Sequence, residues 1–131
     1  MRRVLVIDDE SDITFGIKRC IENEYYVDAF NDPVAALDNF SLGKYDIILI
    51  DVKMPKMNGF ELYRTMQRID SGACYCFITA FEIRPVEFKR MFPSSSVCYF
   101  LKKPFSSEEL LKLLNVQIEE KKNLAESATV N

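Results

Sequence analysis

The sequence contains no histidine and no tryptophan, and only four glycines and five prolines. Without histidine the chain cannot form a Ser-His-Asp triad or a Cys/His zinc site, because both need an imidazole. The four cysteines show neither CxxC nor zinc-ligand spacing: Cys20, Cys74, Cys76 and Cys98. We interpret them as small apolar core residues. Redox sensing is the alternative for Cys74 and Cys76, which would share one face of a strand.

Long hydrophobic runs are also absent, since every apolar segment is far too short to span a membrane. The N-terminus, MRRVLVIDD, leads directly into a predicted strand, so we expect a cytoplasmic protein with no signal peptide. The net charge of -3 gives no electrostatic reason to expect binding to nucleic acid. A chain of 131 residues is long enough for one domain with one hydrophobic core.

Five apolar segments alternate with five predicted helices along the chain. The segments cover residues 4–7, 25–30, 47–50, 74–78 and 97–101. Apolar runs without polar alternation indicate strands of a parallel sheet that is covered on both faces. The predicted fold class is therefore α/β, with a single doubly wound five-stranded parallel sheet between layers of helices and right-handed crossovers.

Local signals predict where the helices begin. We expect Ser11 to cap the first helix, the Asp32-Pro33 pair to open the second, and Asn58 to cap a third over residues 59–69. In the third helix, Ile69 is expected to face inward. A short fourth helix covers residues 85–91, and the fifth begins at residue 107. The domain is predicted to span residues 1–119, with residues 120–131 as a polar, frayed or disordered tail.

Polar side chains are expected to gather at one edge of this sheet. The carboxyl ends of parallel strands lie along the same edge, where α/β proteins bind their ligands. The strand ends deliver these side chains: Asp8 and Asp9 from the first strand, Asp51 from the third, Thr79 from the fourth, and Lys102 and Lys103 from the fifth. Any one of them alone is equally well a cap, a turn residue or a solvated charge. Capping does not explain their coincidence at four strand ends.

The chemistry of these residue types points to phosphoryl transfer. Three carboxylates in one place repel one another unless a cation or a proton intervenes. A hard divalent ion with oxygen ligands, Mg²⁺ above all, would neutralise them. Thr79 and a lysine on the other side suit the oxygens of a phosphoryl group. Asp51, between the two sides, could attack phosphorus and form an aspartyl-phosphate.

With these motifs the sequence resembles the receiver domains of response regulators, the partners of histidine kinases in two-component signalling, and among them the chemotaxis regulators. The matching pieces are Asp8-Asp9, Asp51 with Pro55 and Gly59 four and eight residues later, Thr79-Ala80, and Lys103-Pro104-Phe105. The resemblance covers residues 3–118. It implies a flavodoxin-like three-layer sandwich with the strand order 2-1-3-4-5.

The resemblance also implies a metal and phosphoryl site. Asp9 and Asp51 would bind Mg²⁺, or Mn²⁺, directly, together with the backbone carbonyl of Lys53, while Asp8 would act largely through water. Asp51 would accept the phosphoryl group of a kinase phosphohistidine. Lys103 would bind a phosphoryl oxygen, because the lysine of the family directly precedes a proline.

A switch is implied as well, in which Thr79 moves toward the phosphoryl group and Phe100 turns inward. Phe100 departs from the family, in which tyrosine is commoner there, and plain packing is its alternative role. Structural roles are implied for Pro55 and Gly59 in the loop after Asp51, and for Pro104 after a cis peptide. Lys53 and Phe81 would flank the route of a hydrolytic water, and the sequence leaves the direction of their effect open.

The resulting prediction is a signalling switch and not a turnover enzyme. Its partners would be a sensor histidine kinase or phosphotransfer protein and a downstream protein of unknown identity, with no nucleic acid and no membrane. That protein would bind the fourth helix, fifth strand and fifth helix. We expect a monomer, or a weak dimer that phosphorylation strengthens.

Three other classes of protein compete with this prediction. The serious rival is an interaction module on the same fold that is not phosphorylated. A dehalogenase-type phosphatase is disfavoured, because Lys53 stands where that class needs a second carboxylate. A dinucleotide-binding enzyme is disfavoured because no glycine-rich loop follows any predicted strand.

Overall fold

The computed structural model describes residues 1–82, 84–91 and 97–129. Strands and helices alternate along these residues: β1 (Arg3–Ile7), α1 (Ser11–Ile21), β2 (Tyr26–Phe30), α2 (Pro33–Asp38), β3 (Ile47–Asp51), α3 (Gly59–Ile69), β4 (Cys74–Thr79), α4 (Pro85–Met91), β5 (Val97–Lys102) and α5 (Ser107–Thr129). This alternation confirms the predicted α/β class with five strands and five helices.

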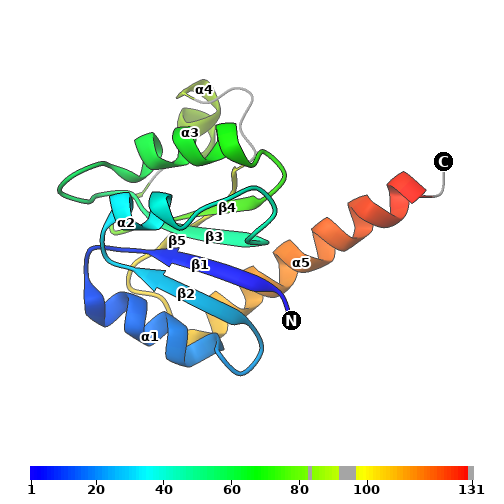
Figure 1. Cartoon of the computed structure of the whole chain (residues 1–131), viewed down its shortest axis with the longest axis horizontal. Helices are drawn as coiled ribbons and strands as arrows, with labels where there is room; N and C mark the ends of the chain where they lie inside the picture. The colour runs from blue at the N-terminus through cyan, green and yellow to red at the C-terminus, as the bar shows by residue number, and fades with distance from the viewer. Residues whose placement is uncertain (83, 92–96, 130–131) are drawn as a thin grey trace.

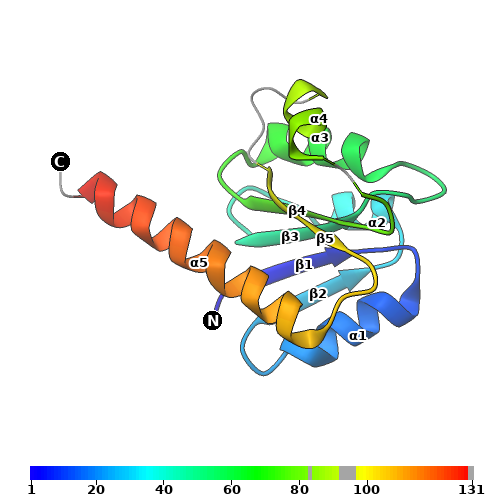
Figure 2. The ribbon, with the colours of Figure 1, turned by 180° about the vertical axis from the view of Figure 1, so that it is seen from behind.

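The five strands form one parallel sheet in the order β2-β1-β3-β4-β5 (Figure 1). Helices α2, α3 and α4 cover one face, and α1 and α5 cover the other (Figures 1 and 2). The central strand β3 is buried at every residue, including the charged Asp51. The three-layer sandwich with the order 2-1-3-4-5 is therefore confirmed.

Alternate residues of the strands supply two separate cores, because successive side chains point to opposite faces of a sheet. On the α2 and α3 side the strands contribute Leu5, Ile7, Ile48, Ile50, Tyr75 and Phe77. On the α1 and α5 side they contribute Val4, Val6, Ile47, Leu49, Cys76 and Ile78. Burial on both sides explains why these runs are apolar throughout.

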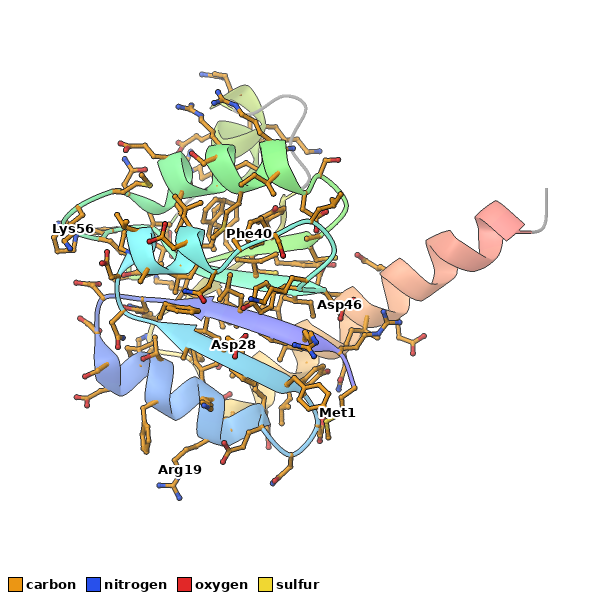
Figure 3. All side chains as sticks on the ribbon, in the orientation of Figure 1. Met1, Arg19, Asp28, Phe40, Asp46 and Lys56 are labelled. Atoms are coloured by element: carbon orange, nitrogen blue, oxygen red, sulfur yellow. The ribbon has the colours of Figure 1, made fainter. Side chains whose placement is uncertain are left out.

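Polar contacts hold the amino ends of the strands, at the edge of the sheet opposite the one that carries Asp51. Asp46 precedes β3, accepts a hydrogen bond from the Arg3 backbone N–H at 2.9 Å and pairs with Arg2 at 3.3 Å. Figure 3 shows Asp46 at this end of the sheet and Lys56 at the opposite end. The Lys56 end is where β3 delivers Asp51.

Two helix caps agree with the sequence and one does not. The side chains of Asp32 and Asn58 accept hydrogen bonds from the first turns of α2 and α3. The prediction for α1 was wrong, because Ser11 is its first helical residue and the N-cap Glu10 makes no side-chain cap. Asp8 turns the chain earlier instead, since its Oδ1 accepts from the Glu10 N–H at 2.9 Å.

The inward face of α3 also differs from the prediction. Ile69 is 41% exposed, whereas Tyr63 is completely buried. The ring of Tyr63 packs edge-on against Tyr75 and Phe77 and fills the space next to the sheet. The last residue of the helix, Ile69, therefore lies at the rim of the core.

Helix α5 continues to Thr129, through the segment that was predicted to be frayed or disordered from residue 120 (Figures 1 and 2). Residues 120–129 contain no glycine or proline and are rich in Glu, Lys, Leu and Ala, which are strong helix formers. The domain boundary at residue 119 stays a prediction. Within the described part of the chain, no helix is long and apolar enough to cross a membrane.

Candidate functional site

Four strands bring the predicted site residues to one edge of the sheet. Asp51 and Thr79 are the last residues of β3 and β4, and Asp8 and Lys103 directly follow β1 and β5. The strand register sets Asp51 beside Ile78 in the neighbouring strand. Asp9, Asp51, Thr79 and Lys103 all line one pocket of about 410 Å³. The predicted convergence of these side chains is therefore present in the structure.

The three aspartates form a compact acidic cluster. One carboxylate oxygen from each of Asp8, Asp9 and Asp51 lies within 4.8 Å of the other two. Asp8 is completely buried and Asp51 is 5% exposed, whereas Asp9 faces solvent. A set of hard oxygen donors with one open side fits a divalent cation such as Mg²⁺.

Burial and charge repulsion hold the pKa of Asp51 far above that of an ordinary carboxyl group. Burial is the largest cause, followed by the negative charge of Asp8, and together with Asp9 they raise the pKa of Asp51 to about 7. The charge of Lys103 opposes this rise. The cluster therefore carries more negative charge than the protein compensates by itself.

Lys103 provides that partial compensation. Its Nζ lies 2.8 Å from Asp8 Oδ2, 3.6 Å from Asp51 Oδ1 and 3.7 Å from Glu10 Oε2, and its side chain is 17% exposed. Burial alone would lower the pKa of Lys103, but these carboxylates raise it, so the ammonium stays charged. Lys102 points elsewhere and pairs with Glu82 at 3.2 Å. The geometry supports Lys103 as the site lysine.

Thr79 is buried beside this pocket, and its Oγ1 accepts a hydrogen bond from the Phe81 N–H at 3.0 Å. Phe100 is half-buried and stacks on Phe77, with ring centroids 5.6 Å apart. Its neighbour Tyr99 is exposed and donates a hydrogen bond to Glu120 at 3.2 Å. The structure thus shows Phe100 packed against a core, and its switch role stays a prediction.

The loop after Asp51 requires glycine at position 59. The Gly59 N–H donates to the Val52 carbonyl at 2.7 Å, which brings the start of α3 against the end of β3. A Cβ on Gly59 would overlap the Asp51 carbonyl oxygen and lie 2.9 Å from Val52 Cα. Pro55 lines the pocket, and the Lys103–Pro104 peptide is cis, as the resemblance implies.

Two residues of the site were missed by the sequence reasoning. Asn31, at the end of β2, donates from Nδ2 to the Asp8 carbonyl at 2.8 Å and to Thr14 Oγ1 at 2.9 Å. Glu10 is the third carboxylate that faces Lys103. The acidic run from Asp8 to Glu10 was a signal for Glu10, whereas nothing in the sequence separates Asn31 from an ordinary turn residue.

Comparisons with known proteins agree with this geometry. The family described as the response regulator receiver domain matches residues 4–115. Response regulator MprA of Mycobacterium avium (strain 104) is 30% identical over 110 residues, which are 83% of this chain and 47% of that protein. This chain therefore spans about half the length of the curated relatives that it matches.

Solved structures show the same architecture. The chemotaxis protein CheY4 of Vibrio cholerae is 29% identical, has a TM-score of 0.76, and the match covers 88% of this chain and 97% of that one. A CheY-like receiver domain protein from Methanospirillum hungatei JF-1 is 21% identical with a TM-score of 0.83, over 94% of this chain and 98% of that one, which is a likeness of fold. The chain belongs to the response regulator receiver domains of two-component systems.

Proposed function

We propose that this receiver domain is a phosphorylation switch in which Asp51 accepts a phosphoryl group from a histidine kinase or a phosphotransfer protein. The observation that carries the proposal is the position of Asp51, buried at the floor of an open pocket. The ammonium of Lys103 lies 3.6 Å from one oxygen of its carboxylate, and the carboxylates of Asp8 and Asp9 complete an acidic cluster around it. This arrangement suits a nucleophile that receives a highly charged group.

The acidic cluster would hold Mg²⁺ or Mn²⁺ for this reaction. Asp9 and Asp51 are the proposed direct ligands, with the backbone carbonyl of Lys53, and Asp8 would act largely through water. When bound, the ion would supply positive charge to the carboxylates and to the phosphoryl oxygens.

The protein side chains then have defined tasks. An ionised Asp51 oxygen attacks phosphorus, the bond from phosphorus to the imidazole nitrogen breaks, and the electron pair stays on that nitrogen. The Lys103 ammonium, 3.6 Å from Asp51 Oδ1, moves to a phosphoryl oxygen and balances the added charge. The Thr79 hydroxyl can donate to another phosphoryl oxygen while it accepts from the Phe81 N–H.

The output would be a changed protein-binding surface and not a chemical product. In this proposal Thr79 and Phe100 transmit phosphorylation to the surface formed by α4, β5 and α5, where a downstream partner binds. Exposed Tyr99 and Val116 border a groove of about 280 Å³ between β5 and α5, which suits such contact. In solution the protein would be a monomer, or a weak dimer that phosphorylation strengthens. Sedimentation that shows a tight dimer of the unmodified protein would contradict this oligomeric state.

Acetyl phosphate with Mg²⁺ tests the phosphorylation itself. Intact-protein mass spectrometry should show one added phosphoryl group on the wild type and none on Asp51→Asn. A receiver of known activity serves as the positive control for the conditions. A wild type that gains no mass while the control is phosphorylated would refute the proposal and favour the rival, an interaction module on the same fold.

A further inference from the structure

Side-chain hydrogen bonds hold the backbone on both sides of Asp9. Asp9 faces solvent, so packing in the core does not fix its carboxylate. The peptide after Asp9 is held through the Glu10 N–H, which donates to Asp8 Oδ1 at 2.9 Å. The peptide before Asp9 is held through the Asp8 carbonyl, which accepts from Asn31 Nδ2 at 2.8 Å. Because each peptide is a rigid plane, the two bonds together restrict both backbone torsions of Asp9.

Asn31 takes the place of the next backbone donor between β1 and β2. The last backbone bond there runs from the Asp8 N–H to the Phe30 carbonyl at 3.1 Å. A parallel ladder that continued would bring the N–H of residue 32 to the Asp8 carbonyl. The chain turns into α2 at Pro33 instead, and the side chain of Asn31 supplies the donor. The edge strand β2 thereby reaches the loop that carries the acidic pair.

The second proton of the Asn31 amide fixes how this side chain is turned. Nδ2 also donates to Thr14 Oγ1 at 2.9 Å, and Thr14 is buried. The Thr14 hydroxyl gives its own proton to the Ser11 carbonyl at 3.1 Å, so toward Asn31 it acts as an acceptor. The Asp8 carbonyl is likewise an acceptor. Both amide protons therefore have an acceptor, and the opposite orientation would set an oxygen against two others.

We propose that Asn31 is a positioning residue that presets the Asp9 carboxylate for the divalent ion, an inference that rests on the metal site of the proposed function. Asn31 acts through the peptide between Asp8 and Asp9 and not by contact with the ion. A carboxylate on a restricted backbone loses less freedom when it binds a cation, so the cation binds more tightly. Hydrogen-bond partners behind direct ligands commonly affect metal affinity in this way.

Mn²⁺ titration of the unphosphorylated protein, followed by the EPR signal of the free ion, tests this role. Loss of one such hydrogen bond should weaken binding by roughly two- to ten-fold. Asn31→Ala should raise the dissociation constant by that factor, and the core should be undisturbed because Asn31 is exposed. Asn39→Ala is the matched control. The Asn39 amide donates to the Ala35 carbonyl at 2.9 Å at the far end of α2, and its loss should leave Mn²⁺ binding unchanged.

Thr14 offers a second pair of variants. Thr14→Ser keeps the hydroxyl and should bind Mn²⁺ as the wild type does. Thr14→Val keeps the shape of the side chain but removes the acceptor for the second amide proton. It should weaken binding by less than Asn31→Ala, because the bond from Asn31 to the Asp8 carbonyl remains. The double variant should match Asn31→Ala, since Thr14 acts through Asn31.

Phosphorylation by acetyl phosphate supplies a separate measurement. Asn31→Ala should need more Mg²⁺ for its half-maximal rate, by the same factor as its loss of Mn²⁺ affinity. At saturating Mg²⁺ its rate should equal that of the wild type, because Asp51 and Lys103 are unchanged. A merely structural role of Asn31 would lower the amount of folded protein and leave the Mg²⁺ requirement of the folded protein as it is.

The outcomes separate the positioning role from the proposed function. Wild-type Mn²⁺ affinity in Asn31→Ala, or an equal loss of affinity in Asn39→Ala, would overturn the positioning role. A lower rate at saturating Mg²⁺ with unchanged Mn²⁺ affinity would also overturn it. A wild type that binds Mn²⁺ but takes no phosphoryl group would refute the proposed phosphorylation alone, because the Mn²⁺ comparison does not depend on it. A wild type that binds no Mn²⁺ would overturn the positioning role and the metal site together.

Discussion

Replacement of Asp51 by asparagine is expected to stabilise the protein against unfolding in the absence of metal. The gain is expected near pH 8 and not in acid. The pKa of the folded-state Asp51 is about 7, against 3.8 for an ordinary Asp, with burial and the charges of Asp8 and Asp9 as the causes. At 1.36 kcal/mol per pKa unit, this difference corresponds to about 4 kcal/mol. Solvent in the open pocket screens part of it, so we expect about 2 kcal/mol.

The direction of this stability change follows from the number of protons that the folded and the unfolded states bind. The folded state keeps the proton of Asp51 at pH values where the unfolded chain has already released it. The wild type therefore loses stability as the pH rises from about 4 to about 7. Asparagine at this position carries no charge at any pH and avoids the loss. The two proteins should thus be equally stable at about pH 3.5, below the ordinary Asp pKa of 3.8, and differ by about 2 kcal/mol near pH 8.

Urea unfolding in EDTA, followed by circular dichroism at both pH values, measures this difference. Asp38→Asn is the matched control, because Asp38 is an exposed acid at the end of α2, and surface substitutions of this kind change stability by less than ~0.5 kcal/mol. Addition of Mg²⁺ should close the gap at the higher pH by stabilising the wild type. An equal gain at both pH values, or a loss near pH 8, would refute the reasoning.

Four further substitutions test the packing and charges of the domain. Lys103→Met removes the cation from buried carboxylates. Without metal it should lower the free energy of unfolding by about 3 kcal/mol near pH 8, measured by the same urea titration. Unchanged stability would contradict the ion pairs of Lys103. Gly59→Ala should cost about 2 kcal/mol, because its Cβ overlaps the Asp51 carbonyl, whereas Gly16→Ala, with open space around it, should gain up to about 1 kcal/mol. Equal effects of these two substitutions on urea unfolding would count against the close approach. Gln117→Leu should gain about 1 kcal/mol, because its amide is completely buried without a partner among the described residues; a loss in the same assay would contradict that burial cost.

The strands and their polar ends could be read from the sequence because helices cover both faces of the sheet. The central strand β3 is covered on both faces and is apolar at every residue before Asp51, so this charged residue marks the strand end directly. The carboxyl ends of parallel strands share one edge, and this was sufficient to place Asp8, Thr79 and Lys103 together. The strand order itself came from the family resemblance, since five apolar runs do not specify which of them are neighbours.

Other features depend on angles and packing that a linear pattern does not contain. Ile69 and Tyr63 both fit an apolar helical stripe, and only the space beside the sheet selected Tyr63. Ser11 has a side chain that could cap a helix. However, the hydrogen bond from the Glu10 N–H to Asp8 Oδ1 turns the chain earlier, so Ser11 is already the first helical residue. Such choices follow from which neighbours lie within hydrogen-bond distance, and many sequences share the same local signal.

The amino-acid sequence by itself determined the α/β class, the buried strands and the residue types that end them, because the periodicity and chemistry of side chains are local properties. The tertiary structure alone decided the partners. It set the Lys103 ammonium 2.8 Å from Asp8 and 3.6 Å from Asp51, brought Asn31 to the Asp8 carbonyl, and placed the Lys53 ammonium on the ring of Phe81. These contacts join residues far apart in the chain, and their distances depend on how the whole sheet and its loops pack.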